Sequence, residues 1–324
     1  MARLTPEIDV NLNLPIIKQL ELKNIFTVLD FLEEDADRLC TITGLVYKNI
    51  IEIRRQILSK FSAKSNNGLE CYKKMLVMTA KINTGIKKLD DLLEGGMLTG
   101  NIYEICGLSG IGKTQLCFTI ASHVTTNLKQ PVYYVDTKHD FSSQRILQIM
   151  RTHHFNDMEI QAAMENLKVT RVNDIYEMIT FLHSLGSMLE NMPCRLIIVD
   201  SITALFTPFL NEQRNDGLGL LNHVAATMKR ISVTYQTVFV TVNLATSFID
   251  NDDLDGQQTA DVCWYGDIRP KLGKAWMHMP ASRLLMHRES SMPDHERIVT
   301  LIKSTDLQLA KKCVLKVTSS GLEG

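Results

Sequence analysis

Eight consecutive residues decide the fold of this chain: Gly107, Leu108, Ser109, Gly110, Ile111, Gly112, Lys113 and Thr114. They fit the phosphate-loop pattern Gly-x4-Gly-Lys-Ser/Thr. A triphosphate requires many donors at short range, and glycines allow backbone N–H groups to converge on one point. Lys113 would place an ammonium on the outer phosphates, and the Thr114 hydroxyl is a hard oxygen ligand suited to Mg2+. The stretch therefore predicts a site for a nucleoside triphosphate and Mg2+.

The segments on either side of the loop have the context that the motif requires. Residues 101–106 (NIYEIC) are typical of a short β-strand that enters the loop, and residues 115–124 (QLCFTIASHV) have helix-compatible spacing. The helix would add the positive end of its dipole to the anion site. In a chain of this length, the pattern would arise by accident about one time in a hundred, and the flanking strand and helix lower that figure further.

The composition describes a chain that can bury a large core but carries almost no net charge. It has 324 residues, of which 45% are hydrophobic, and a formal net charge of −1. No global field therefore draws it onto DNA or a membrane, so any nucleic-acid contact must be local or shared with partners. The seven cysteines lack metal-site spacing, and no apolar run reaches the ~18 residues of a membrane span. We expect a soluble intracellular protein with no membrane partner.

The first 61 residues predict a small helical domain. Apolar residues recur at helical spacing in four segments: 15–20, 25–32, 36–40 and 47–61. The turn Thr43-Gly44-Leu45 resembles the hairpin of helix-hairpin-helix modules that bind the DNA backbone. Four basic residues are candidates to face phosphates: Lys48, Arg54, Arg55 and Lys60. A helical domain with no DNA role and a solvated basic face explains the same residues, so the sequence leaves both interpretations open.

The rest of the chain divides into a linker and a large domain. Residues 62–80 open with the polar turn formers SAKSNNG, which are typical of a linker. From residue 81 onward, predicted strands alternate with predicted helices. The strands are expected at 101–106, 131–136, 167–172, 195–200 and 237–242, and helices between them at 115–124, 142–151 and 175–188. This alternation predicts an α/β fold with a mostly parallel, doubly wound sheet and a ligand at the carboxyl ends of its strands.

An acid ends one of these predicted strands. Residues 195–200 (RLIIVD) form a continuous apolar run that is typical of a strand buried on both faces. The Asp200 carboxylate can orient Mg2+, usually through water, opposite Thr114. An apolar run that ends in Asp is most often structural, but downstream of a phosphate loop Asp200 becomes the favoured metal partner.

Further segments extend the match beyond the phosphate-loop pattern. They are Thr84-Gly85, Leu89-Asp90, Leu92-Leu93, residues 107–115, Tyr134-Val135-Asp136, Ile198-Val199-Asp200-Ser201, residues 269–276 (RPKLGKAW) and Ser282-Arg283-Leu284-Leu285. Together they resemble the RecA/RadA recombinase family, especially its eukaryotic branch, over nearly the whole chain. Residues 44–48 and 61–63, with the length and the short tail, are most similar to the D-type recombinase paralogue.

The resemblance implies a fold, a site and a biological setting. The fold would be a RecA-like P-loop ATPase core at residues 81–324, preceded by a linker at 62–80 and a small all-helical domain at 1–61. The cofactors would be ATP and Mg2+. The family places nucleotide-binding residues at 107–114, Gln115 and Arg145, and metal ligands at Thr114 and Asp200. Other recombinase paralogues would be the partners, in homologous-recombination DNA repair in the nucleus.

Arg145 lies where the adenine-stacking arginine of the family falls. A solvated charge on a helix explains this residue equally well, so both interpretations stay open.

One departure from the family bears on hydrolysis. The family carries a glutamate that orients the attacking water two residues after the acid that here is Asp136, and Lys138 occupies that position. An ammonium cannot accept a proton from water, and its charge would favour the triphosphate ground state. Asp140 would substitute only if the loop were reshaped. No residue is therefore assigned as catalytic.

A second departure follows the predicted strand at 237–242. The family ends this strand with an Asn and a polar residue that senses the γ-phosphate. Here Asn243 is followed by Leu244, whose side chain cannot make that hydrogen bond. Coupling between the nucleotide and a DNA loop is expected to be weak.

The third departure concerns DNA. The family binds single strands with two loops, which here would be residues 208–219 and 245–271. The second loop carries six aspartates, at Asp250, Asp252, Asp253, Asp255, Asp261 and Asp267, and its basic residues come only near its end, at Arg269, Lys271 and Lys274. Because carboxylates repel phosphate, we expect the chain alone to bind single-stranded or branched DNA weakly. Trp264 and Tyr265 would either stack on bases or anchor a partner contact, and both stay open.

Three functions compete on this evidence. The favoured one is an ATP-binding subunit of a mediator complex that supports recombinase filaments on single-stranded DNA, with the nucleotide stabilising the assembly. An autonomous DNA-dependent ATPase that forms its own filaments is the alternative, against which Lys138, Leu244 and the acidic loop count. The third is a P-loop kinase or an unrelated ATPase regulator, and the recombinase-like segments Thr84-Gly85 and residues 269–276 count against it. Weak DNA-dependent ATPase activity is left open.

Overall fold

A ten-stranded sheet forms the centre of the larger part of the chain. The computed structural model describes residues 2–63, 65–209, 216–247 and 268–324. The strands of this sheet are β3 (Ile102–Gly107), β4 (Val132–Asp136), β5 (Leu167–Arg171), β6 (Leu196–Asp200), β7 (Val238–Ser247), β8 (Ile268–Pro270), β9 (Ser282–His287), β10 (Glu296–Ser304), β11 (Lys312–Thr318) and β12 (Gly321–Glu323). Two shorter strands, β1 (Lys81–Ile82) and β2 (Met97–Leu98), pair with each other beside it.

The strand order confirms the predicted, mostly parallel sheet. It runs β12-β11-β10-β9-β3-β7-β6-β4-β5, with β8 paired to β7. All pairs from β9 to β5 in this order are parallel, whereas β10, β11 and β12 continue the sheet by antiparallel pairing. The phosphate-loop strand β3 therefore lies in the interior of the sheet, between β9 and β7.

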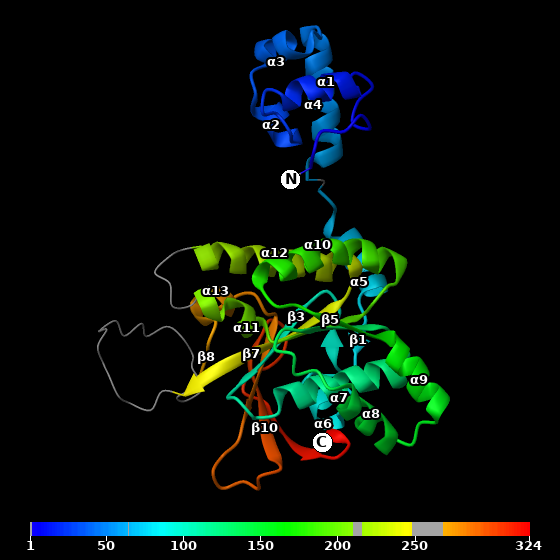
Figure 1. The fold of residues 1–324 in the computed structure, drawn as a ribbon, viewed down its shortest axis with the longest axis vertical. Helices are drawn as coiled ribbons and strands as arrows, with labels where there is room; N and C mark the ends of the chain where they lie inside the picture. The colour runs from blue at the N-terminus through cyan, green and yellow to red at the C-terminus, as the bar shows by residue number, and fades with distance from the viewer. Residues whose placement is uncertain (1, 64, 210–215, 248–267) are drawn as a thin grey trace, which may run out of the picture. The chain divides into compact units, whose positions relative to one another are not determined.

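Helices cover both faces of the sheet, as a doubly wound fold requires (Figure 1). One face packs on α6 (Lys87–Leu92), α7 (Lys113–Thr126), α8 (Ser143–Thr152) and α9 (Asp157–Asn166), and the other on α10 (Ile175–Asn191), α11 (Ile202–Phe206), α12 (Asp216–Tyr235) and α13 (Gly273–Met277), with a 3-10 turn at Thr207–Phe209. In β6, Ile198 packs into the first core and Ile197 and Val199 into the second, because strand side chains alternate between faces. Within the described ranges, no helix is long and apolar enough to cross a bilayer.

The N-terminal residues form four helices around their own core. They are α1 (Leu14–Glu21), α2 (Val28–Glu33), α3 (Ala36–Thr43) and α4 (Tyr47–Phe61), close to the predicted segments. The predicted turn ends α3, with Gly44 at φ 70° in the left-handed region that glycine tolerates. Three of the four basic candidates have partners inside this domain: Arg54 donates to the Glu34 carbonyl, Lys60 to the Glu7 carbonyl, and Arg55 pairs with Glu52. These contacts give those side chains a structural role that needs no DNA.

The chain separates into two compact units, Met1–Lys74 and Met75–Gly324. The division falls within the predicted linker at residues 62–80. Eleven of these residues form the helix α5 (Gly68–Met78), none of whose side chains is buried. The linker prediction for residues 62–80 did not include this helix, and α9 and the antiparallel strands β10 to β12 were also not predicted.

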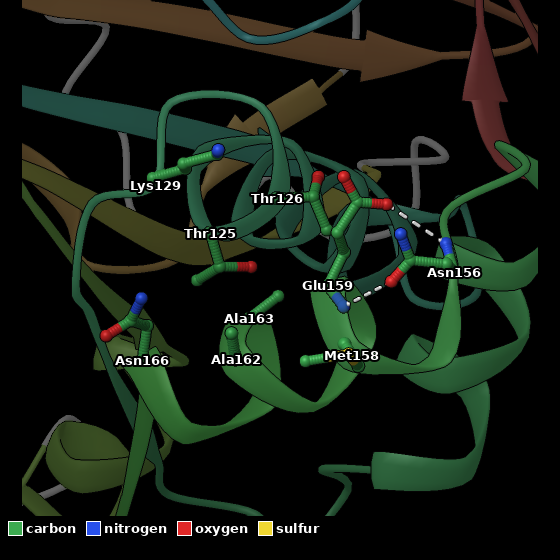
Figure 2. Close-up of a pocket in the computed structure, with 9 residues that line it drawn as sticks. All are labelled: Thr125, Thr126, Lys129, Asn156, Met158, Glu159, Ala162, Ala163 and Asn166. Atoms are coloured by element: carbon green, nitrogen blue, oxygen red, sulfur yellow. Dashed lines mark hydrogen bonds between the residues drawn. The ribbon is translucent and has the colours of Figure 1, made fainter.

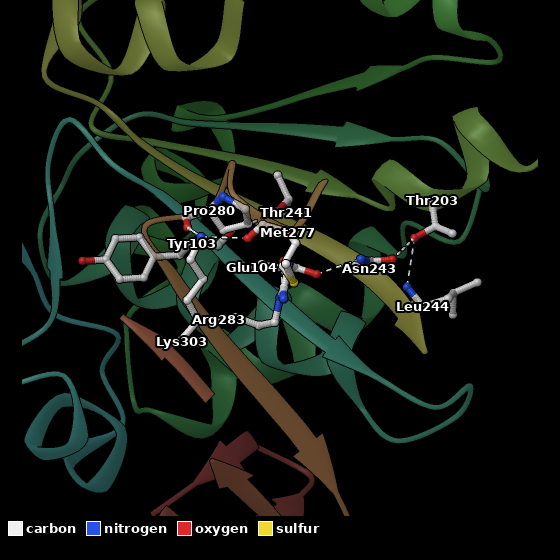
Figure 3. Close-up of polar contacts among 10 residues, drawn as sticks. All are labelled: Tyr103, Glu104, Thr203, Thr241, Asn243, Leu244, Met277, Pro280, Arg283 and Lys303. Carbon is white, nitrogen blue, oxygen red and sulfur yellow. Dashed lines mark hydrogen bonds and ion pairs between the residues drawn. The ribbon is translucent and has the colours of Figure 1, made fainter. Parts of the chain in front are cut away.

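Buried charges tie the three strands around the phosphate loop together (Figure 3). Glu104 of β3 has no exposed surface, and its two carboxylate oxygens accept from Asn243 Nδ2 of β7 at 2.7 Å and from Arg283 Nε of β9 at 2.6 Å. Asn243 Oδ1 in turn accepts from the Thr203 hydroxyl at 2.7 Å, and that hydroxyl accepts from the Leu244 N–H. A single carboxylate therefore fixes the relative positions of β3, β7 and β9.

We expect Glu104→Gln to lower the free energy of unfolding by about 3–5 kcal/mol, because the buried Arg283 guanidinium would lose its counter-charge. The matched control is Glu52→Gln, which removes a carboxylate from an exposed pair with Arg55 and should cost less than about 1 kcal/mol. Urea unfolding of the two variants measures the difference. Equal small losses in both would contradict the role of Glu104.

Candidate nucleotide-binding site

The phosphate loop connects the end of β3 to the start of α7, as the sequence predicts. A Cβ atom on Gly107 would lie 2.4 Å from the Met286 carbonyl oxygen of β9, so only glycine fits at that point. Gly110 and Gly112 have φ of 74° and 106°, in the left-handed region that L side chains rarely adopt. Gly112 is the N-cap of α7, so the loop ends at the positive pole of a fourteen-residue helix.

Lys113 is buried behind the loop. Its Nζ donates to the carbonyl oxygens of Gly107 and Leu108, each at 2.7 Å. Burial, with a smaller contribution from the charge of Lys138, lowers the pKa of Lys113 to about 8, and the charge of Asp200 opposes the change. The ammonium is therefore held within the loop by backbone oxygens. An anion bound beside it would raise the pKa of Lys113.

Asp200 ends β6 and is 4% exposed. Its Oδ2 accepts from the Tyr134 hydroxyl at 2.9 Å, whereas its Oδ1 is buried and has no hydrogen-bond partner among the described residues. Burial raises the pKa of Asp200, while the nearby Thr114 hydroxyl, the hydrogen bond from Tyr134 and the charges of Lys138 and Lys113 act in the opposite direction. The side chains of Thr114 and Asp200 thus come together, as expected from the sequence.

These donors fit a hard divalent cation. A buried carboxylate oxygen without a partner is costly unless a cation or a donor satisfies it. The Thr114 hydroxyl and the Asp200 carboxylate are both oxygen donors, the ligand type that Mg2+ prefers in proteins. If Mg2+ binds here, these two residues would hold it and its charge would neutralise phosphate oxygens.

The turn after β4 places Lys138 near this site. The Asp136 carboxylate, 1% exposed, accepts from the backbone N–H groups of Lys138, Asp140 and Phe141. The Thr137 hydroxyl donates to the Ser201 carbonyl and accepts from the Ser201 N–H, both at 2.8 Å. The turn is thereby fixed against the end of β6, and the charge of Lys138 acts on both Lys113 and Asp200.

Asp140 follows Lys138 in the same turn. Its side chain is exposed, and its backbone N–H is committed to Asp136. Among the described residues, the carboxylate that acts on Lys113 is Asp200, whose Oδ2 already accepts from Tyr134. A general base for water would need an unengaged carboxylate beside the phosphate loop.

Arg145 of α8 makes four hydrogen bonds at the edge of its guanidinium. Its Nε donates to Gln115 Oε1 at 2.8 Å, and its two terminal nitrogens donate to Gln148, to the Ser319 carbonyl and to the Thr318 carbonyl. These bonds fix the guanidinium plane next to the first residue after the loop. A guanidinium held by its edge presents its face for stacking. Arg145 and Gln115 are thus in contact, and stacking of Arg145 on adenine stays a prediction.

Three residues at the site were not singled out by sequence. Arg297 of β10 donates from Nε to the Ile111 carbonyl at 2.9 Å and so holds the phosphate loop from outside. Tyr134 and Thr137 orient Asp200 and the Lys138 turn. Tyr134 and Thr137 could have been suspected from the sequence, because they lie near the end of a predicted strand, as Asp200 does. Nothing in the sequence points to Arg297, which is a single arginine in a distant strand.

The polar residue expected after Asn243 is absent here, since Leu244 contributes only its backbone. Its N–H donates to Thr203, and its carbonyl accepts from Lys271 N at 2.7 Å. The six aspartates from Asp250 to Asp267, with Trp264 and Tyr265, lie outside the described residues, as does part of the first loop at 210–215. Of the expected basic residues, Arg269 lies on β8 and Lys271 directly follows it.

A cavity of about 380 Å³ lies at the other end of α7 (Figure 2). It is lined by Thr125, Thr126, Lys129, Asn156, Met158, Glu159, Ala162, Ala163 and Asn166. Thr125 is twelve residues from Lys113, or about 18 Å along the helix. Asn156 and Glu159 are engaged as the capping box of α9. The cavity is therefore separate from the phosphate loop.

The sheet order, the phosphate loop and an acid at the end of β6 together define a RecA-like nucleotide-binding fold. The family model for Rad51 matches residues 74–324, and the model for the RAD51D N-terminal domain matches residues 1–60. This chain belongs to the Rad51 family, which confirms the resemblance seen in the sequence, including that to the D-type paralogue. Nucleotide binding is the general property of this family.

Several relatives are similar over most of the chain. It is 31% identical to DNA repair protein RAD51 homolog 4 of Bos taurus over 300 residues, which cover 90% of this chain and 88% of the relative. The Mus musculus protein of the same name is 31% identical over 297 residues, covering 89% and 86%. Meiotic recombination protein DMC1 of Saccharomyces cerevisiae is 25% identical over 326 residues, covering 97% and 92%.

We expect the affinity for ATP to fall as the pH rises from 7 to 9. Because the pKa of Lys113 is lowered to about 8, the unliganded protein holds this side chain increasingly neutral above that pH, and a neutral amine attracts phosphate less. At pH 9 about one tenth of the side chains would be protonated, so the Kd should rise about tenfold from pH 7. Calorimetric titration with ATP across this range measures it.

Lys138→Met supplies the control, since the charge that it removes lowers the pKa of Lys113. Its loss of affinity should begin at a higher pH. A Kd that stays constant up to pH 9 in the unchanged protein would contradict the assignment of Lys113.

Proposed function

We propose that this chain is an ATP-binding subunit of a mediator complex of recombinase paralogues. The complex would support recombinase filaments on single-stranded DNA during homologous-recombination DNA repair in the nucleus. The names of its relatives, DNA repair proteins and a meiotic recombination protein, support this setting. The observation that carries the binding role is Lys138, whose charge acts on Lys113 and Asp200 at the place where a water-activating carboxylate is needed.

The nucleotide is bound in this proposal by the residues that the sequence predicted. Backbone N–H groups of residues 107–114 surround the phosphates, and Lys113 supplies an ammonium. Thr114 and Asp200 hold Mg2+, and the fixed face of Arg145 stacks on adenine beside Gln115. Lys113, Asp200 and Arg145 are already oriented by hydrogen bonds within the protein, which lowers the entropic cost of binding.

Hydrolysis requires a general base, and in the described part of the chain the two buried carboxylates at this site already have other roles. The Asp136 carboxylate accepts from three backbone N–H groups, and one oxygen of Asp200 accepts from Tyr134. A positive Lys138 stabilises the charged triphosphate before reaction, which raises the barrier if the transition state gains nothing more. Bound ATP then acts as a structural component, and a ligand that binds the assembled form stabilises that form by mass action.

An edge of the sheet offers a surface for a neighbouring paralogue. β5 is the last strand of the order, and its middle residue Val169 is 40% exposed. A strand at a sheet edge presents backbone groups that a segment of another chain can pair with. This edge adjoins β4, which leads into the Lys138 turn, so a partner bound there would lie close to the nucleotide. The DNA contact of the chain alone would stay weak.

The test is a comparison of ATP binding and turnover by the purified chain, alone and with paralogue partners, with and without single-stranded DNA. We expect micromolar-range binding with turnover near the background rate, and we expect Lys113→Ala to lose both ATP and partner affinity. Fast turnover by the isolated chain, lost in Lys113→Ala, would show an autonomous ATPase instead. Undiminished partner binding by Lys113→Ala would refute the structural role of ATP.

A second test addresses the edge strand. Val169→Lys places a charge on β5 and should reduce co-purification with a paralogue partner about tenfold or more, while ATP affinity is unchanged. Val233→Lys is the matched control. Val233 is 51% exposed on α12, which covers one face of the sheet, whereas β5 is a strand at its edge. Equal effects of the two substitutions would place the partner elsewhere.

A further inference from the structure

Two lysines lie close enough to the nucleotide site to act on each other electrostatically, and they are held differently. Lys113 Nζ has two carbonyl partners at 2.7 Å. The Lys138 ammonium, in contrast, makes neither an ion pair nor a hydrogen bond within the described ranges of the chain. Its side chain is partly buried, so the unpaired charge is shielded from some of the surrounding water. A cation held in this way attracts an anion.

The nearby acids do not neutralise Lys138. The Asp136 carboxylate has three backbone donors of its own turn. Asp200 has Tyr134 on one oxygen, and its charge is shared between Lys113 and Lys138. With two lysines and one available carboxylate, the site carries an excess of positive charge before any ligand arrives.

The backbone fixes where this charge lies. Asp136 and Asp200 are register partners in the parallel pair of β4 and β6. The Thr137 N–H donates to the Asp200 carbonyl at 3.0 Å, and the Thr137 hydroxyl makes two bonds to Ser201. Lys138 follows directly, so its Cα is anchored beside the residue that would hold the metal. Its ammonium and a cation bound at Asp200 would thus act on the same phosphate oxygens.

We propose that Lys138 is a phosphate-binding residue that carries part of the charge normally supplied by Mg2+, so that the site retains nucleoside triphosphate when the metal is withheld. This inference rests on the proposed ATP-binding function and extends it. Each Lys138→Glu exchange changes the charge of the site by two units, which equals the charge of one Mg2+. Lys138 itself supplies one positive charge, half that of Mg2+, so it replaces the metal only in part.

The experiment measures the Kd of ATP for the full chain in Mg2+ and in EDTA. In the unchanged protein we expect EDTA to weaken binding by no more than about tenfold. The quantity compared is the ratio of the Kd in EDTA to the Kd in Mg2+. In Lys138→Glu this ratio should be larger than in the unchanged protein by about tenfold or more, and in Lys138→Met it should lie between the two. Lys138→Arg keeps the charge and should restore the ratio of the unchanged protein, which separates charge from packing.

The matched control is Lys129→Glu, which makes the same charge change on an exposed lysine beyond the far end of α7. It should leave the ratio unchanged. Urea unfolding midpoints confirm that each variant is folded. If ATP binds in Mg2+ and the ratio is the same in Lys138→Glu as in the unchanged protein, the inference is wrong although the proposed function stands. If ATP does not bind in Mg2+ at all, the proposed function fails, and the inference with it.

Discussion

The buried carboxylate of Glu104 is the constraint on which the nucleotide site depends. A charge without exposed surface is tolerated only when its partners stay in place, and here the partners come from β7 and β9 on either side of β3. The phosphate loop leaves β3 three residues later and packs against the Met286 carbonyl of β9. The position of the loop is therefore set by an ion pair in the sheet below it. Burial and the charge of Arg283 lower the pKa of the neighbouring Lys303, and Glu104 opposes this.

The site above this scaffold is organised for holding charge. Among the described residues, the Asp136 carboxylate is held by its own turn and Asp200 is bonded through one oxygen, whereas the Lys138 ammonium has no hydrogen bond or ion pair. A site that hydrolyses ATP needs a carboxylate that is free to act as a base, and a cation that acts mainly in the transition state. The same residues that fit a triphosphate thus argue against its rapid turnover. This balance supports the proposal that the nucleotide serves assembly.

Much of the fold could be predicted because its signals are local. The loop from Gly107 to Thr114, the buried run that ends at Asp200 and the alternation of strands with helices each appear within a short window of sequence. The contacts of Arg145 could not be read in that way, since its partners Thr318 and Ser319 lie more than 170 residues away. The contact of Arg297 could not be predicted for the same reason, because this residue reaches Ile111 from a distant strand.

By itself, the sequence determined the nucleotide-binding class, the parallel sheet and the lysine at the position of a catalytic acid, because these depend on residue type and spacing. Only the tertiary structure decided what those residues contact. It brought Asp200 against Thr114 and Tyr134, turned the Asp136 carboxylate onto its own backbone and left Lys138 without a counter-ion among the described residues. The physical reason is that electrostatic interactions depend on distance and burial, which long-range packing sets and local sequence does not.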